Sequence, residues 1–159
     1  MTIKKIISIF TICLLFSCQT KTQKKEVFRV TKTEQEWKNQ LTELQYYVLR
    51  QAGTERAGSS PLDKIYTPGI YSCAGCNTPL FNAADKFNSG TGWPSFDKEI
   101  KDNVAFSVDY NIGMARTEEH CAVCGGHLGH VFNDGPRKTT GKRHCINGAA
   151  LTFTPTPNE

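Results

Sequence analysis

The sequence predicts a mainly β protein of the α+β class, built from antiparallel β-sheets with one helix near the N-terminus. From Pro61 onward, glycines and prolines recur every few residues and separate short apolar runs, several of which alternate with polar residues as half-buried strands do. Before Pro61, apolar residues recur at helical spacing over residues 33–52. Two Cys-x-x-Cys elements in the β region complete the pattern, since each suits the turn of a hairpin.

The N-terminus predicts a secretory signal over residues 1–17. Two lysines precede an apolar run over residues 6–16, which is too short to cross a bilayer and suits a signal peptide. The residues before Cys18 resemble a bacterial lipobox, which implies cleavage before Cys18 and lipidation of its thiol. We therefore expect a lipid-anchored protein of the bacterial cell envelope that faces the periplasm. An ordinary cleaved signal followed by an incidental cysteine is the alternative.

The rest of the chain predicts a short tether and a single domain. Residues 18–30 are polar and show no periodic pattern, so we interpret them as a lipidated N-terminus followed by a flexible tether. Residues 31–155 are enough for one domain with its own core. The formal net charge of +4 includes both leader lysines, and the remaining basic residues form no stripe. We expect a monomer without a nucleic-acid partner.

The one predicted helix begins at Thr33 and ends near Gly53. Thr33 and Glu36 have the spacing of a capping box, in which each side chain bonds the backbone amide of the other. Glycine is a common residue just beyond a helix. The expected core-facing stripe consists of Trp37, Leu41, Leu44 and Val48.

The predicted strands fall on the short apolar runs of the β region. They cover residues 69–73, 104–108, 112–117, 127–132, 143–149 and 151–153. An Asn-Asp-Gly-Pro sequence at residues 133–136 predicts a turn between two of them.

Four cysteines form two pairs, Cys73 with Cys76 and Cys121 with Cys124. The spacing within each pair lets two thiolates converge on one ion, and four thiolates make a closed tetrahedral site. We therefore predict one structural Zn²⁺ that joins two hairpins distant in sequence. Two disulfides or a redox-active pair are the alternatives, because an exported chain meets an oxidising compartment. A disulfide across so short a loop contributes little stability, however.

Cys145 is the one cysteine that neither the leader nor the two pairs account for. Arg143 and Asn147 flank it, and His127 and His130 lie upstream. The thiolate is the reactive form of cysteine, and neighbouring cations and proton donors govern its formation. The arrangement predicts a nucleophilic sulfur chemistry.

Five segments in this order resemble the methionine sulfoxide reductase B family, the reductases of methionine-R-sulfoxide. They are the two cysteine pairs and residues 90–96, 125–136 and 143–147. The resemblance covers roughly residues 33–154. It implies three catalytic residues: Cys145 attacks the sulfoxide sulfur, His130 helps to protonate the departing oxygen, and Asn147 is the amide near the nucleophile. It further implies three substrate contacts, an orienting pair and four zinc ligands: Trp93, His127 and Phe132; Asp134 and Arg143; and Cys73, Cys76, Cys121 and Cys124.

Simple chemistry agrees with these implied roles. A sulfoxide becomes a good electrophile only when its oxygen is protonated, so thiolate attack needs an acid nearby. Trp93 on a Gly-Trp-Pro turn makes an apolar wall for a methylthio group. His127 and His130 both face one pocket only if their strand is bent, for which we expect Gly129 to be responsible. Structural histidines and a core tryptophan are the alternatives.

The resemblance implies repair of oxidised envelope proteins through a sulfenic acid on Cys145. Many family members carry a second, resolving cysteine where this chain has Thr91. We therefore expect a thioredoxin-like partner or a small thiol to reduce Cys145 directly. The alternatives are a zinc-stapled binding module with the same fold and no catalysis, and a thiol–disulfide exchanger.

Overall fold

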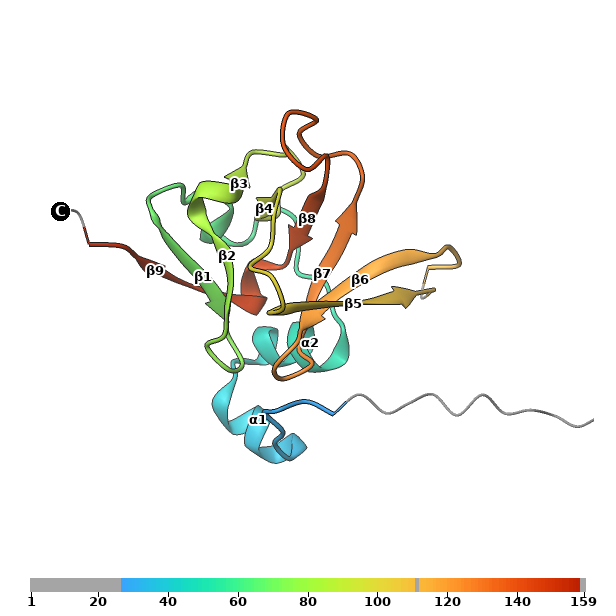
Figure 1. Ribbon diagram of the computed structural model, residues 1–159. Coiled ribbons are helices and arrows are strands. Elements are labelled where there is room, and N and C mark those ends of the chain that lie inside the picture. The colour runs from blue at the N-terminus through green and yellow to red at the C-terminus, as the bar shows by residue number, and fades with distance from the viewer. Residues whose placement is uncertain (1–26, 111, 158–159) are drawn as a thin grey trace, which may run out of the picture.

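The structure consists of two antiparallel β-sheets with two short helices at one end (Figure 1). It is a computed structural model that describes residues 27–110 and 112–157. One sheet has the strand order β2-β1-β9 and the other β3-β4-β8-β7-β6-β5. This arrangement confirms the predicted mainly β, α+β class. The predicted signal, the lipidation site Cys18 and most of the tether lie outside the described residues.

The helices of the described part are α1 (Glu34–Gln40) and α2 (Glu43–Gln51), with short 3-10 helices η1 (Pro61–Lys64), η2 (Ala83–Asp85) and η3 (Gly148–Ala150). The strands are β1 (Gly69–Cys73), β2 (Pro79–Asn82), β3 (Lys86–Phe87), β4 (Ser95–Phe96), β5 (Val104–Asp109), β6 (Arg116–Cys121), β7 (His127–Phe132), β8 (Arg143–Ile146) and β9 (Leu151–Pro155). Within the described residues, no helix is long and apolar enough to span a membrane.

The strand predictions succeed where the apolar run is bounded by turns. The predictions over residues 69–73 and 127–132 coincide with β1 and β7. The prediction over residues 112–117 is wrong, because most of this run forms the β5–β6 turn and β6 begins at Arg116. The prediction over residues 143–149 is too long, because β8 ends at Ile146. Strands β2, β3 and β4 were not predicted, since each has two to four residues.

The single predicted helix is in fact two helices that meet at Leu41 and Thr42. The capping box at Thr33 is confirmed, but Leu41 is extended with φ −98° and ψ 148°. Thr42 then starts α2 with a second capping box, since it accepts from the Gln45 amide and donates its own amide to the Gln45 side chain. The break takes Leu44 off the buried stripe and leaves it 46% exposed.

Helix α2 ends at Ala52 rather than at Gly53. Ala52 takes the left-handed conformation with φ 53°. Gly53 is needed for another reason, because a Cβ there would lie 2.3 Å from the ring of Tyr47. The chain continues to Thr54, which lines the pocket around Cys145.

Aromatic side chains form the centre of the core. Phe81 stacks on Phe96 with ring centroids 4.4 Å apart, and Tyr71 meets Phe96 edge-on at 5.0 Å. All three side chains are fully buried, and each contributes about 1.5–3 kcal/mol of hydrophobic stabilisation. They come from β1, β2 and β4, so the core ties the smaller sheet to the larger one.

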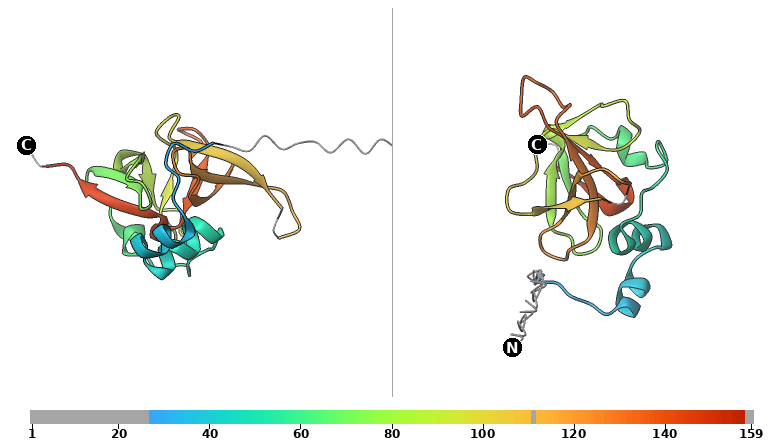
Figure 2. Two further views of the ribbon diagram at one scale, coloured as in Figure 1. Left: turned by 90° about the horizontal axis from the view of Figure 1, so that it is seen from below. Right: turned by 90° about the vertical axis from the view of Figure 1, so that its right-hand side faces the viewer.

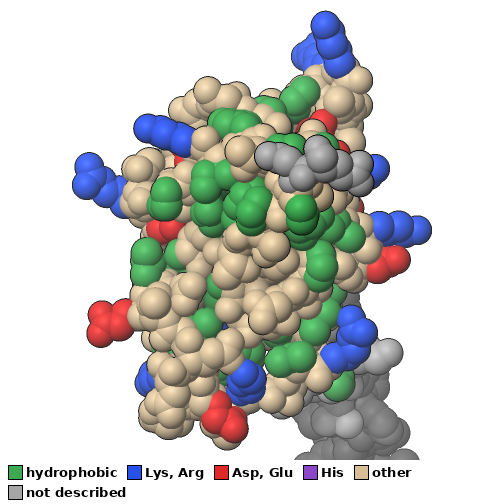
Figure 3. All heavy atoms as spheres, turned by 90° about the vertical axis from the view of Figure 1, so that its left-hand side faces the viewer, with side chains coloured by type: hydrophobic (Ala, Val, Ile, Leu, Met, Phe, Trp, Pro, Cys, Tyr) green, Lys and Arg blue, Asp and Glu red, His purple; other side chains and the backbone are tan. Residues whose placement is uncertain are grey.

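Two elements project from this body in opposite directions. Strand β9 extends to one side and the β5–β6 hairpin to the other, while α1 and α2 cover one end of the sheets (Figure 2). On the face seen from the β9 side, apolar side chains gather toward the centre and charged ones lie mostly at the margin (Figure 3).

Candidate functional site

The four paired cysteines come together between the two sheets. Cys73 ends β1 and Cys76 lies in the turn before β2, whereas Cys121 ends β6 and Cys124 lies in the turn before β7. All four sulfur atoms lie within 4.8 Å of one another. The group therefore joins one hairpin of each sheet, as the spacing of the pairs predicted.

The distances between the sulfurs suit a tetrahedral metal site. The Sγ atoms of Cys73 and Cys124 lie 3.7 Å apart, and those of Cys76 and Cys121 lie 3.5 Å apart. Metal–sulfur bonds of about 2.3 Å in a tetrahedron place two sulfurs roughly 3.8 Å apart. A disulfide requires about 2.05 Å, and these four cysteines are free thiols. The donor set and its geometry fit a metal ion better than two disulfides.

The two cysteine turns share one backbone design. Asn77 and Gly125, one residue beyond each pair, take the left-handed conformation with φ 59° and φ 68°. Their amides donate to the carbonyls of Cys73 and Cys121, at 2.8 Å in both turns. This geometry closes each turn tightly and directs both sulfurs of a pair toward the other hairpin.

Cys145 lies in the middle of β8, in the floor of a pocket of about 150 Å³ on the larger sheet. The pocket brings together four other residues that the sequence predicted for the site, namely Trp93, His130, Phe132 and Asn147. His127 lines an adjoining hollow instead. Thr54, Arg116 and Gly129 also line the pocket and were not predicted as contacts.

A bulge in β7 puts the two histidines on one face of the sheet. Glu119 pairs with Gly129 and His120 pairs with His127, so Leu128 is an extra residue in β7. The rings of His127 and His130 lie 5.5 Å apart as a result. The expected bend is therefore present, but Gly129 serves a different purpose, since a Cβ there would lie 2.0 Å from the carbonyl oxygen of Cys145.

His130 lies opposite Cys145 on the neighbouring strand, and the carboxylate of Asp109 contacts its ring. His130 and Cys145 are direct cross-strand partners, so their side chains share a face. The His130 Nε2 lies 2.8 Å from Asp109 Oδ2, and Arg116 Nη2 lies 2.5 Å from the same oxygen. Burial lowers the pKa of His130, and Asp109 opposes this effect. The ring is therefore largely neutral at pH 7, and Asp109 is placed to stabilise it when it takes up a proton.

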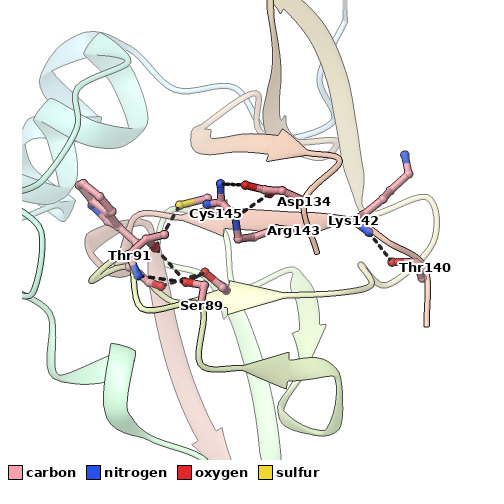
Figure 4. Close-up of polar contacts among 9 residues, drawn as sticks. Ser89, Thr91, Asp134, Thr140, Lys142, Arg143 and Cys145 are labelled. Carbon is pink, nitrogen blue, oxygen red and sulfur yellow. Dashed lines mark hydrogen bonds and ion pairs between the residues drawn. The ribbon is translucent and has the colours of Figure 1, made fainter. Parts of the chain in front are cut away.

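The sulfur of Cys145 lies between a hydroxyl and a cation (Figure 4). Burial raises the pKa of the thiol, whereas the charge of Arg143 and the hydrogen bond with Thr91 lower it. The resting sulfur is thus a protonated thiol with two groups poised to stabilise the thiolate. Such a residue becomes nucleophilic when a base nearby accepts its proton.

Arg143 and Asp134 form the pair that the resemblance implied. The Nε and Nη2 atoms of Arg143 each lie 2.9 Å from one oxygen of Asp134, which is the bidentate geometry. The guanidinium also lies over the ring of Phe132, 4.4 Å from its centroid. Asp134 and Phe132 together hold Arg143 beside Cys145, and the guanidinium in turn lowers the pKa of Asp134.

Both polar atoms of the Asn147 side chain form hydrogen bonds with backbone groups. Its Nδ2 donates to the carbonyl of Leu128 at 3.0 Å, and its Oδ1 accepts from the amide of Glu55 at 2.9 Å. The residue is 3% exposed. It braces the end of β8 against the bulge of β7, so its contacts are those of a positioning residue.

Glu55 is a residue of the site that the sequence did not reveal. Its side chain is 4% exposed and accepts from the amides of Gly148 and Ala149, at 2.6 Å and 2.9 Å. Its carbonyl accepts from the indole Nε1 of Trp93 at 3.2 Å. One residue therefore connects the loop that carries Trp93 to the segment that follows Cys145.

The remaining histidine of β8 faces the core. His144 is fully buried, and its Nδ1 lies 2.6 Å from an oxygen of the equally buried Glu119. Burial raises the pKa of Glu119. This pair lies on the opposite face of the sheet from Cys145, which agrees with the structural role expected for His144. His120 is also buried, at 7% exposed.

Comparison with known proteins gives one family. The model of the SelR domain matches residues 41–155. The chain is 57% identical to a chloroplastic peptide methionine sulfoxide reductase B1 of Oryza sativa subsp. japonica, over 75% of this chain and 56% of that protein. It is 48% identical to the mitochondrial methionine-R-sulfoxide reductase B3 of Mus musculus, over 87% of this chain and 53% of that protein.

A bacterial relative matches along almost its whole length. The peptide methionine sulfoxide reductase MsrB of Leptospira interrogans is 51% identical over 79% of this chain and 96% of that protein. The chain thus spans little more than half of the plant and mouse proteins but nearly all of the bacterial one. A solved structure, the Mis18 'Yippee-like' domain, has a TM-score of 0.47 at 14% identity over 58% of this chain and 100% of that one, and adds nothing to the assignment. The chain belongs to the methionine sulfoxide reductase B family.

Proposed function

We propose that the protein reduces methionine-R-sulfoxide in proteins to methionine, with Cys145 as the nucleophile. The observation that carries this proposal is the pocket of about 150 Å³ in which Cys145 lies beside His130 and Trp93. A cavity of about this size holds one apolar group no larger than benzene. The names of the relatives support the same reaction.

The proposed reaction transfers one oxygen and two electrons. The sulfur of Cys145 attacks the sulfoxide sulfur, and the oxygen is protonated and leaves as water as the S–S bond forms. Water then attacks the sulfur of Cys145, the S–S bond breaks, and a proton is released. The products are methionine and a sulfenic acid on Cys145, so the thiol is oxidised and the sulfoxide is reduced. In this proposal His130 accepts the thiol proton and returns it to the oxygen. Asp109, whose Oδ2 lies 2.8 Å from the His130 Nε2, stabilises the intervening imidazolium.

Trp93 and Phe132 provide the apolar walls for the methylthio end of the substrate. Both line the pocket with Cys145, and each also contacts a residue that does not line the pocket. Glu55 accepts from the indole of Trp93, and Arg143 covers the ring of Phe132. Walls held in this way select the shape of the sulfur substituents, which supports discrimination between the two sulfoxide epimers.

We propose that an external thiol recycles the enzyme. Among the described residues, Cys145 is the one cysteine outside the four-sulfur cluster. Within the described residues the sulfenic acid has no thiol outside the cluster with which to condense, so we propose that a thioredoxin-like protein or a small thiol attacks it directly.

The ion of the four-cysteine cluster is proposed to be Zn²⁺. Four thiolates in a closed tetrahedron are typical of structural zinc, and such a site leaves no position for a substrate. Cys73, Cys76, Cys121 and Cys124 would hold the ion, whose contribution is folding free energy. The chemistry at Cys145 does not involve it.

Lipid anchoring and repair of periplasm-facing envelope proteins are proposed from the leader sequence around Cys18. The expected outcome is that the full-length chain partitions into detergent and that Cys18→Ala abolishes acylation. Mass spectrometry of the mature N-terminus measures both. Cleavage at another position, or an unmodified Cys18, contradicts the anchor and leaves the reductase proposal unaffected.

The activity itself is tested with separated sulfoxide epimers. The purified protein, supplied with a dithiol reductant, should reduce peptide-bound methionine-R-sulfoxide and leave the S epimer unchanged. Product is measured by chromatography. A protein that reduces neither epimer, yet binds oxidised peptides, would favour the binding-module alternative.

A further inference from the structure

A second hollow adjoins the Cys145 pocket and is lined by residues from the end of α2 and from the β5–β6 hairpin. It encloses about 240 Å³. Thr54, Arg116 and His130 line both hollows, so the two form one trough. The Cys145 pocket has room for a single side chain. Whatever carries that side chain must therefore leave the pocket along the trough or over its rim.

Two large apolar side chains from different elements are exposed at the second hollow. Tyr47 of α2 is 46% exposed, and Ile112 of the hairpin turn is 61% exposed. Both line the hollow. Exposed apolar side chains that line one concavity are typical of a binding site, and an aromatic ring is a frequent anchor in such sites. These side chains suit an apolar side chain of a ligand.

Two residues that line the hollow, Arg116 and His127, each have a buried side-chain nitrogen without a hydrogen-bond partner. The Nε of Arg116 and the Nε2 of His127 are buried without a hydrogen-bond partner, and His127 is 5% exposed. The Nδ1 of His127 lies 2.6 Å from Glu118. When Nδ1–H donates to this carboxylate, the Nε2 of the neutral ring is an acceptor, whereas the Nε–H of Arg116 is a donor.

A polypeptide main chain matches this pair of groups. Every residue other than proline carries one N–H donor and one C=O acceptor. Buried polar atoms are nearly always paired. These two nitrogens are closed to solvent in the free protein, so a main chain reaches them only when the lining side chains move. An extended chain also places side chains i and i+2 on one side, roughly 7 Å apart. One side chain can thus enter the Cys145 pocket while its neighbour enters the second hollow.

We infer that the second hollow is a subsite for the polypeptide next to the sulfoxide, which takes an apolar side chain within two residues of it. The inference rests on the proposed function and names the substrate class. The substrate is methionine-R-sulfoxide in an extended, accessible segment with an apolar neighbour, rather than the free amino acid. Tyr47 and Ile112, which line the hollow, select the neighbour.

The experiment uses a set of matched peptides. Each carries one methionine-R-sulfoxide in a Gly/Ser background, with a single Leu at position −2, −1, +1 or +2, or with none. With the full-length protein in detergent, Leu at one of these positions should lower KM about tenfold and change kcat little, as burial of an apolar side chain predicts. Tyr47→Ala and Ile112→Ser should each remove most of that gain.

Leu44→Ala is the matched control, because Leu44 lies on the same helix, is also 46% exposed and lines a different hollow. It should keep the preference for Leu at the same position. Equal KM values for all peptides would overturn the subsite while turnover upholds the proposed function. A preference that survives both Tyr47→Ala and Ile112→Ser would also overturn it. Failure of every peptide to react would instead refute the proposed function.

Discussion

The hydroxyl of Thr91 lies 3.9 Å from the sulfur of Cys145 (Figure 4). Ser89 holds this hydroxyl from the other side at 2.9 Å, and Ser89 in turn contacts the Ser95 hydroxyl at 2.8 Å. A chain of three hydroxyls therefore ends at the nucleophile. The side chain at position 91 is oriented toward the sulfur, at the place where the family resemblance implies a resolving cysteine in many members.

Thr91→Cys should supply an internal resolving thiol. After one equivalent of sulfoxide, the wild-type protein should hold a sulfenic acid that a specific reagent traps. The variant should instead form a disulfide between positions 91 and 145, because a sulfur at position 91 lies beside the sulfenic acid. Mass spectrometry of digested protein distinguishes the two products. Ser89→Cys is the control, since Ser89 contacts Thr91 rather than Cys145. A sulfenic acid that persists in Thr91→Cys contradicts the placement of the loop.

Cys145→Ser should abolish turnover without unfolding the protein. A hydroxyl is a far weaker nucleophile than a thiol at neutral pH, so we expect residual activity below about 1% of the wild type. Steady-state rates, circular dichroism and metal content measure the three properties together. Activity of several per cent, with the fold intact, would assign the chemistry to another cysteine.

Cys76→Ser or Cys121→Ser should lose the metal and unfold. The cluster connects the two sheets, and structural zinc in small domains contributes on the order of 10 kcal/mol. The wild-type protein should hold about one zinc ion per chain, as Cys145→Ser should too. Atomic absorption and thermal unfolding provide the readouts. A folded, active and metal-free variant would show that the cluster is dispensable, and two disulfides would then have to be reconsidered.

Glu55→Gln should weaken both the fold and the site. The substitution keeps the shape of the side chain but replaces a charged acceptor of two backbone amides, which lie 2.6 Å and 2.9 Å away. We expect a loss of about 1–3 kcal/mol in the free energy of unfolding and a lower kcat, because Trp93 and Asn147 both bond the Glu55 backbone. Denaturant titration and kinetics provide the measurements. Glu43→Gln, at an exposed position, should change neither; equal effects of the two substitutions would refute a specific role.

Local signals carried most of what the sequence predicted correctly. The capping box at Thr33 and the cysteine turns at Cys73 and Cys121 depend on residues one to four positions apart, so their geometry can be inferred from spacing. The same reasoning failed at Thr42. A second capping box was present in the sequence there, but the apolar stripe across it favoured one continuous helix. Burial of Leu41 and exposure of Leu44 decided between the two patterns.

The sequence by itself determined the β-rich class, the four-cysteine cluster and the singular position of Cys145, because each depends on residue type and short spacing. Only the tertiary structure decided how the site is supported. Glu55 bonds amides 93 and 94 positions away, and Asp109 meets His130 across 21 positions. The bulge at Leu128 appears only in the pairing of β6 with β7. Such contacts join segments with no shared pattern, and the packing of the two sheets and α2 brings them together.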